Sequence, residues 1–212
     1  MPVLLAIDSS PMAEVSVTRR LIRDFVGLWR ERYPAGEVLY RDLGANPPPH
    51  PDALTLGAFA KPVHAVSPLE KEALRYSDRL VEELLAADHV VIGSPMYNFT
   101  VTSGLKAWID LVGRPGKTFS YGPEGAVGLL KDKQIVVVTG RGGFYADAGA
   151  EADNDFQEGY LRAYFRFMGL NDVRFVHAEG QGVDVETARR MESEALDQVR
   201  ALFDSGVFTP AP

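Results

Sequence analysis

The sequence predicts an α/β fold, a doubly wound parallel sheet with helices on both faces, built from 212 residues. Short apolar runs alternate along the chain with longer stretches in which apolar residues recur at helical spacing. Most of the short runs are continuously apolar, as strands buried on both faces are. The stretches that join them are long enough for the crossover helices that parallel strands need.

Five strand-like segments carry the sheet. "VLLAID" is the first short apolar run, and "EVLYRDL" alternates like a strand nearer an edge. "QIVVVTG" is the most continuous β-branched run, which predicts a central strand. The predicted strands are Val3–Asp8, Glu37–Leu43, His89–Gly93, Gln134–Gly140 and Asp172–Glu179.

Five helices alternate with these strands. Apolar residues recur at helical spacing in the first of them. The motif "SPLE" opens the second with Ser67 as a cap, Pro68 at the first helical position and Glu70 completing a capping box. The predicted helices are Thr18–Arg32, Pro68–Ala87, Thr102–Val112, Asp153–Met168 and Val185–Phe203.

The segment Gly44–Val66 interrupts this alternation. Its beginning, "GANPPPHPD", holds four prolines, which fix φ and remove backbone donors, so no regular element is expected there. A short helical turn is expected near Leu54–Phe59. An excursion of this length is usually functional or part of an interface. Since no repeat and no linker divides the chain, we expect one domain over residues 1–212.

Composition and charge restrict the classes of function. The formal net charge of −7 argues against a nucleic-acid groove, which needs a basic excess. The absence of cysteine excludes disulfides, thiolate nucleophiles and cysteine–metal sites, and the four histidines lack clustered ligand spacing, so no metal is expected. "MPVLLAIDSS" has no basic region before a short apolar stretch, so we expect no signal peptide, no membrane span and a cytoplasmic protein.

Ligands of open α/β sheets bind beyond the carboxyl ends of the strands, where the strand order reverses. Three predicted loops lie there, at 9–18, 94–104 and 141–151. In the first, Ser10, Ser16 and Thr18 flank a helix N-terminus, which favours an anion such as phosphate. A plain helix cap by Ser16 explains the same residues.

The second and third loops offer a different chemistry. The second opens with "SPMYNF" at 94–99, in which Pro95 restrains the residue before it to extended backbone. Its methionine and two aromatic residues offer flat, polarisable contacts, and Asn98 supplies donors and acceptors; packing in the core or against a subunit is the alternative. In the third, "GRGG" lets backbone approach a ligand closely. A tight turn explains these glycines equally, and Arg141 is then a solvated charge.

The sequence does not match either of two common nucleotide-binding motifs. The first loop lacks the glycines of a dinucleotide fingerprint. "GRPGKT" imitates the end of a Walker A loop, but the required first glycine falls on Leu111 and a helix precedes it instead of a strand. A phosphate-binding protein or P-loop-like transferase is therefore not favoured.

Read in order, "SS…SVT", "PMYNF" with "LKAWIDLV", "GKTFSY", "GPEG", "RGG" and "HAEG" resemble the FMN-dependent NADH:quinone oxidoreductases, or azoreductases, of bacteria. The resemblance covers nearly the whole chain, and "PMYNF" followed by "LK" is its most specific part. It implies a flavodoxin-like fold whose five parallel strands have the order 2-1-3-4-5. It also implies FMN held non-covalently in a homodimer.

The resemblance assigns the binding residues. The FMN phosphate would be held by Ser10, Ser16, Val17 and Thr18. The isoalloxazine would be lined, with backbone N–H groups near its N5 edge, by Met96, Tyr97, Asn98 and Phe99. The pyrimidine end would meet Gly140, Arg141, Gly142 and Gly143. Phe99 and three further aromatic residues are candidates for a roof over the ring, partly across the dimer interface, or for ordinary packing: Phe119, Tyr121 and Tyr145.

Three positions depart from the family pattern. Val17 and Thr18 stand where relatives carry a polar residue and serine, so Val17 offers only its backbone N–H. Gly140 replaces a serine, which removes a hydroxyl contact. The loop after Gly142 is longer or shifted, and we expect it to influence the choice of substrate.

The family's reaction proceeds in two halves. NADH or NADPH gives hydride to the flavin, and a quinone, azo or nitroaromatic compound then takes two electrons at the same place. Because the flavin carries the chemistry, no catalytic acid or base is expected. The alternative is a flavodoxin-type carrier that binds FMN and turns over no small substrate. The excursion Gly44–Val66 favours the enzyme, since a carrier gains little from enclosing the ring.

Overall fold

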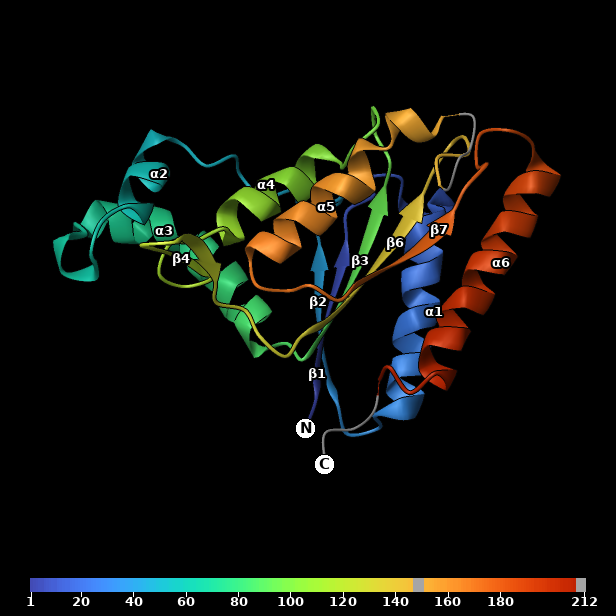
Figure 1. Ribbon diagram of the computed structural model, residues 1–212, viewed down its shortest axis with the longest axis horizontal. Coiled ribbons are helices and arrows are strands. Elements are labelled where there is room, and N and C mark those ends of the chain that lie inside the picture. Colours follow the sequence, from blue (N-terminus) through green and yellow to red (C-terminus); the bar gives the residue numbers. More distant parts are fainter. Residues whose placement is uncertain (147–150, 209–212) are drawn as a thin grey trace.

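A five-stranded parallel sheet forms the centre of the computed structural model, which describes residues 1–146 and 151–208 (Figure 1). Its order is β2-β1-β3-β6-β7, and every neighbouring pair is parallel. The strands are β1 (Val3–Asp8), β2 (Glu37–Asp42), β3 (His89–Pro95), β6 (Gln134–Gly140) and β7 (Val173–Ala178). The predicted α/β fold with five parallel strands is therefore confirmed.

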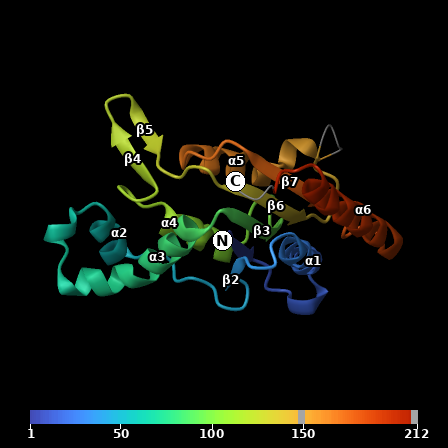
Figure 2. The ribbon, with the colours of Figure 1, turned by 90° about the horizontal axis from the view of Figure 1, so that it is seen from below.

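The numbering of the strands differs from the predicted order 2-1-3-4-5 because an unpredicted hairpin intervenes. β4 (Phe119–Gly122) and β5 (Gly125–Gly128) pair antiparallel in a separate two-stranded sheet. Figure 2 shows the hairpin standing apart from the main sheet. Its glycine- and proline-rich sequence carries little of the β-branched pattern that marks a strand.

Helices cover both faces of the sheet. α1 and α6 lie on one face, and α3, α4 and α5 on the other (Figures 1 and 2). The α-helices are α1 (Val17–Arg32), α2 (Ala53–Phe59), α3 (Pro68–Ala86), α4 (Ser103–Val112), α5 (Phe156–Phe167) and α6 (Val185–Asp204). Short 3₁₀ turns cover Ala13–Val15, Val63–Ala65 and Ala152–Asn154. Along the two described ranges, no helix combines the length and apolar character that crossing a membrane requires.

Each face has its own apolar core. Trp108 of α4 and Phe165 of α5 are buried on one face, and Phe25 and Trp29 of α1 on the other. β6 is an interior strand between β3 and β7, whereas β2 is half-buried at an edge, as its alternating sequence predicts. Burial of these large apolar side chains is the main source of stability.

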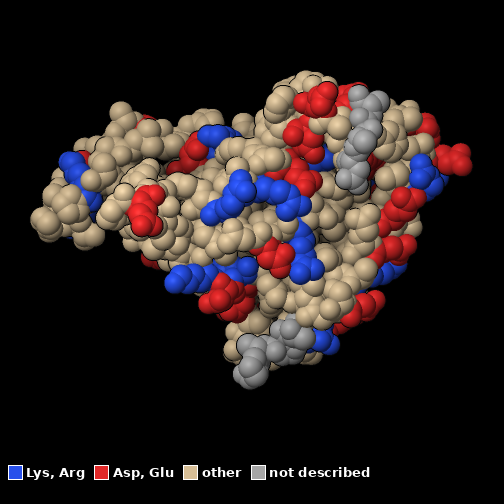
Figure 3. Space-filling view, in the orientation of Figure 1, with Lys and Arg blue, Asp and Glu red and all other residues tan. Residues whose placement is uncertain are grey.

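The capping residues act as predicted. Ser67 and Glu70 form a reciprocal capping box at the start of α3. The helical turn expected in the excursion is α2, and Asp52 caps it by accepting the N–H of Thr55 at 2.8 Å. Lysine, arginine and acidic side chains are interspersed over the face in Figure 3, with acidic groups prominent along α6.

Candidate functional site

The three loops predicted to bind a ligand leave adjacent strands at one edge of the sheet. In register, Asp8 of β1 pairs with Gly93 of β3, and Pro95 of β3 pairs with Gly140 of β6. The N–H of Met96 donates to the carbonyl of Gly140 at 2.8 Å, which fastens the second loop to the third. Residues 147–150 of the third loop lie outside the described residues.

The first loop places hydroxyls and backbone donors at the start of α1. Ser10, Ser16 and Thr18 are all buried, and the Ser16 and Thr18 hydroxyl oxygens lie 3.0 Å apart. Ser16 also caps α1 by accepting the N–H of Arg19 at 3.4 Å. The N–H groups of Val17 and Thr18 have no acceptor among the described residues. Free N–H groups at a helix N-terminus attract an anion, and the hydroxyls can complete its coordination.

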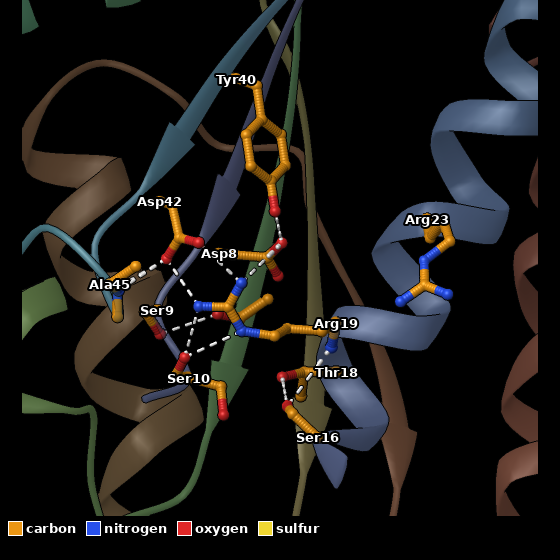
Figure 4. Close-up of polar contacts among 12 residues, drawn as sticks. Asp8, Ser9, Ser10, Ser16, Thr18, Arg19, Arg23, Tyr40, Asp42 and Ala45 are labelled. Atoms are coloured by element: carbon orange, nitrogen blue, oxygen red, sulfur yellow. Dashed lines mark hydrogen bonds and ion pairs between the residues drawn. The ribbon is translucent and has the colours of Figure 1, made fainter. Parts of the chain in front are cut away.

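Arg19 fixes this loop from behind (Figure 4). Its Nε and Nη2 donate to the carbonyl of Ser10 at 3.0 and 2.7 Å, and Nη1 and Nη2 donate to the two oxygens of Asp42 at 2.7 and 2.6 Å. Burial opposes ionisation of Asp42, but hydrogen bonds from Arg19 and from backbone N–H groups outweigh it and lower the pKa of Asp42. A Cβ at Gly44 would lie 2.0 Å from the Ser10 carbonyl oxygen, so only glycine fits there.

Asp8 is a buried carboxyl behind the same loop. It is 2% exposed, Tyr40 donates its hydroxyl to Oδ2, and Oδ1 has no partner among the described residues. Burial raises the pKa of Asp8, against the hydrogen bond from Tyr40 and the charge of Arg19, whose Nη1 lies 3.9 Å from Oδ2. Asp8 and Tyr40 border a cavity of about 490 Å³ between α1 and β2.

Replacing Asp8 with asparagine is expected to stabilise the protein at neutral and higher pH. Because the folded-state pKa of Asp8 is raised, the folded protein binds this proton more tightly than the unfolded chain does. Its contribution to stability therefore decreases as pH rises from the unfolded pKa through the folded one. Urea unfolding should give Asp8→Asn an advantage of about 1 kcal/mol at about pH 8 and almost none at about pH 4. If the free energies of unfolding of Asp8→Asn and the wild-type protein differed equally at both pH values, this prediction would be contradicted.

The second loop is a tight turn with an unusual backbone. The N–H groups and carbonyls of Tyr97 and Thr100 exchange two hydrogen bonds of 2.9 and 3.1 Å around Asn98 and Phe99. These two central residues have φ of 49° and 69°. Positive φ at both positions suits Asn or Gly, and a phenylalanine there stores strain of the kind found at ligand sites. The N–H groups of Asn98 and Phe99 have no acceptor among the described residues.

The aromatic side chains of this loop are not in the core. Tyr97 is 38% and Phe99 44% exposed, so the core-packing alternative does not apply to them. The Tyr145 ring meets that of Phe99 edge-on, with centroids 6.5 Å apart. A cavity of about 470 Å³ borders the loop. Its lining residues are Tyr97, Asn98, Thr100, Val101, Ser103, Lys106 and Tyr160.

Two of the three predicted substrate residues do not lie at this edge of the sheet. Phe119 and Tyr121 belong to β4, away from the carboxyl ends of the main strands (Figure 1). Phe119 is buried in the core, and its ring centroid lies 4.6 Å from that of Phe167 and 5.4 Å from that of Tyr121. Within one chain, therefore, only Tyr145 of the three joins the hexapeptide.

In the third loop, the interpretation of Arg141 as a solvated charge is wrong. Its side chain is fully buried, and Nη1 lies 3.0 Å from Asp155 and 3.3 Å from Glu179. A buried cation needs such partners because it has lost its water. Next to it, a Cβ at Gly140 would lie 2.7 Å from the Val17 side chain. The two departures from the family pattern, Val17 and Gly140, therefore fit each other.

A neighbouring loop holds residues 141–146 in place. Main-chain N–H groups of Gly180, Gln181 and Gly182 donate to the carbonyls of Gly143, Arg141 and Gly142, each at 2.9 Å. The Glu179 carboxylate accepts the N–H groups of Tyr145 and Ala146 at 2.8 and 2.9 Å. The N–H groups of Gly142 and Gly143 have no acceptor among the described residues and remain available to a ligand.

Sequence reasoning missed Arg19, Gln157 and Glu179. The motif "HAEG" points to Glu179, since a carboxylate directly follows a strand and precedes a glycine. No local signal marks Arg19, because its partners are distant in sequence: Ser10 lies in the loop after β1 and Asp42 at the end of β2. The site therefore combines the N-terminus of α1, which suits an anion, the turn at 96–99 with its exposed aromatic side chains, and the buried Arg141. Across residues 1–146 and 151–208, no group of three or more His, Asp or Glu residues could hold a metal ion.

The fold and the site define a flavodoxin-like protein: a family model described as the flavodoxin-like fold matches residues 3–202. FMN-dependent NADH:quinone oxidoreductase 2 of Pseudomonas putida is 44% identical over 199 residues, covering 94% of this chain and 98% of that protein. FMN-dependent NADH:quinone oxidoreductase 3 of Pseudomonas aeruginosa is 41% identical over 211 residues, covering 99% and 97%. The chain belongs to this family of FMN-dependent NADH:quinone oxidoreductases, which confirms the resemblance.

Solved structures agree with this assignment. An azoreductase from Bacillus anthracis is 28% identical, with a TM-score of 0.87 over 95% of this chain and 98% of that one. An FMN-dependent NADH-azoreductase from the same species, solved in complex with FMN, is 25% identical with a TM-score of 0.83, over 95% of this chain and 99% of that one. The similarity therefore spans the candidate site as well as the sheet.

Proposed function

We propose that the protein, as one domain over residues 1–212, binds FMN non-covalently and uses NADH or NADPH to reduce quinones and azo compounds. One observation carries the proposal: three adjacent loops at one edge of the sheet carry backbone N–H groups that have no acceptor among the described residues and that a flat, phosphorylated cofactor can use. When bound, FMN supplies the hydride chemistry, so the side chains bind, orient and exclude water. The family assignment supports this function over that of an electron carrier.

The start of α1 is the proposed phosphate site. The helix N-terminus and its free N–H groups stabilise the phosphate charge, and the buried hydroxyls can donate to its oxygens. Arg19, itself paired with Asp42, holds the carbonyl of Ser10 in place behind the loop. The residues proposed to bind the phosphate are Ser10, Ser16, Val17 and Thr18.

The turn at 96–99 is the proposed wall for the isoalloxazine. Its strained backbone fixes the N–H groups of Asn98 and Phe99 before a ligand arrives, so little ordering is needed on binding. Gly142 and Gly143 would stabilise negative charge at the pyrimidine end with their N–H groups. The residues proposed to contact the ring are Met96, Tyr97, Asn98, Phe99, Gly140, Arg141, Gly142 and Gly143. Arg141 acts there by holding the glycine loop in place, because its side chain is buried between Asp155 and Glu179 and its N–H donates to the carbonyl of Ala178 at 3.0 Å.

The acceptor site is proposed to be completed by a second copy of the chain. Tyr145 is placed beside Phe99, whereas the exposed Tyr121 lies on the hairpin and reaches a flavin only across a homodimer interface. Phe119, which packs in the core, supports Tyr121 from below. Quinone, azo and nitroaromatic compounds are flat and suit an aromatic site. We place the protein in the cytoplasm, where NADH and NADPH are available.

Turnover by the purified protein tests the proposal. FMN-loaded protein is mixed with NADH or NADPH, with and without a benzoquinone, and nucleotide oxidation is followed by absorbance. We expect oxidation that depends on both FMN and quinone. FMN binding with quinone-dependent turnover at the background level would establish the electron-carrier alternative instead.

Asn98 is expected to matter more for turnover than for folding. Glycine adopts a φ of 49° without strain, so Asn98→Gly should keep the turn and leave the melting temperature within a few degrees. Loss of the amide side chain should lower kcat/KM for the quinone by about tenfold. An unchanged rate would contradict the role of the Asn98 side chain, and a Val substitution, strained at this φ, should instead lower stability.

A further inference from the structure

Gln157 joins the end of β3 to the loop that follows β6. Its side chain is fully buried in the first turn of α5. Nε2 donates to the Ser94 carbonyl at 2.9 Å and lies 3.1 Å from the Ser94 hydroxyl, while Oε1 accepts from Nε of Arg141 at 3.3 Å. One amide thus contacts both segments that lead into the proposed flavin-binding loops.

The chemistry of this bridge requires an amide. The Ser94 carbonyl accepts a hydrogen bond here and the Arg141 Nε–H donates one, and a primary amide offers both a donor and an acceptor from one planar group. A carboxylate has no donor, and an aliphatic side chain has neither. A buried polar atom left without its partner costs free energy, so the surrounding backbone would move to recover one.

Ser94 lies near the end of β3, where it pairs with Thr139 of β6, and Gln157 adds a side-chain contact there. The next residue is Pro95, which has no N–H to pair with the neighbouring strand, and the turn at 96–99 begins immediately afterwards. On the other side, Arg141 is held by Asp155, which also accepts the N–H of Gln157 at 3.0 Å as the cap of α5. The start of α5, the end of β3 and the third loop are therefore one hydrogen-bonded unit.

We propose that Gln157 is a positioning residue that, together with the hydrogen bond between Met96 and Gly140, sets the separation between the turn at 96–99 and the glycine loop at 140–143, and so fixes the bound flavin. It acts through Ser94 and Arg141, since its own side chain is buried. This inference rests on the proposed FMN site between those two loops.

Two variants test it. Gln157→Leu keeps the approximate size and removes all three side-chain hydrogen bonds, and Gln157→Glu keeps the acceptor for Arg141 but removes the donor to Ser94. The matched control is Gln134→Leu, because Gln134 lies at the opposite end of β6 and its buried Oε1 has no hydrogen-bond partner in residues 1–146 and 151–208. Each FMN-free protein is titrated with FMN by flavin fluorescence, and the midpoint potential of the bound flavin and its kcat and KM for NADH are measured.

Gln157→Leu should raise the Kd for FMN about tenfold, or about 1.4 kcal/mol, and shift the midpoint potential. The fold-decrease in kcat of Gln157→Leu should exceed the fold-change in its KM for NADH. Gln157→Glu should bind FMN more tightly than Gln157→Leu but have the more negative potential, because its added negative charge disfavours the reduced flavin. The control should match the wild-type protein in all of these.

Unchanged FMN affinity and midpoint potential in Gln157→Leu would overturn the inference, as would an equal effect in Gln134→Leu. Thermal unfolding without FMN shows whether each variant folds. If the leucine variant does not fold, Gln157→Glu decides alone: wild-type values of Kd and potential overturn the inference. Failure of the wild-type protein to bind FMN is a different result, because it refutes the proposed function itself.

Discussion

Replacing Arg141 with methionine is expected to destabilise the protein by about 3–5 kcal/mol, the largest effect of any single change considered. The guanidinium is fully buried between Asp155 and Glu179. Without it, two carboxylates remain at the same place with no cation, and Gln157 loses the donor to its carbonyl oxygen. Urea unfolding monitored by circular dichroism measures the change.

An exposed arginine provides the control for this prediction. Arg200 pairs with Asp197 on the surface of α6, where both side chains are more than half exposed. Arg200→Met should change the free energy of unfolding by no more than about 0.5 kcal/mol. Adding Asp155→Asn and Glu179→Gln to Arg141→Met should recover part of the loss, because it removes the uncompensated charges. A loss below about 1 kcal/mol for Arg141→Met alone would contradict the assigned role of the buried pair.

Replacing Gly44 with alanine is expected to raise the Kd for FMN by about tenfold or more and to lower stability by about 1–3 kcal/mol. The new Cβ would lie 2.0 Å from the carbonyl oxygen of Ser10 and 2.8 Å from Nη2 of Arg19. Backbone cannot yield as a flexible side chain does, so the Ser10 segment must move and its hydrogen bonds from Arg19 must lengthen or break. Fluorescence titration with FMN and urea unfolding measure the two effects.

A second glycine tests whether the effect is specific to that contact. Gly27 lies within α1, and a Cβ there meets no atom within 4 Å. Gly27→Ala should leave FMN affinity unchanged and stabilise the helix by up to about 1 kcal/mol. If Gly44→Ala bound FMN as well as Gly27→Ala does, the proposed link between Gly44 and the phosphate loop would be wrong.

The sequence was most informative where a pattern repeats locally. Continuous apolar runs located β1, β3 and β6, and the cap predicted at Ser67 lies where α3 begins. The alternation in "EVLYRDL" correctly placed β2 at an edge. Local periodicity indicates which face of an element is buried, and it can be read from one sequence without any others.

Contacts between distant segments were not predictable in the same way. The hairpin β4–β5 has little strand propensity and forms by pairing and by packing of Phe119 on the core. The burial of Arg141 depends on Asp155 and Glu179, which approach it only after the sheet has formed. The residues of the turn at 96–99 were identified, but their positive φ values were not, since Phe99 is a poor choice for that backbone.

The attachment of residues 141–146 to residues 178–182 has a consequence for biosynthesis. The glycine loop leaves the ribosome well before the segment whose N–H groups and carboxylate hold it. A nascent chain that ends just before β7 already has the start of α1 and the turn at 96–99, but its glycine loop lacks the hydrogen bonds that residues 178–182 provide. Cofactor loading is therefore expected to follow translation of β7, late in synthesis of the chain.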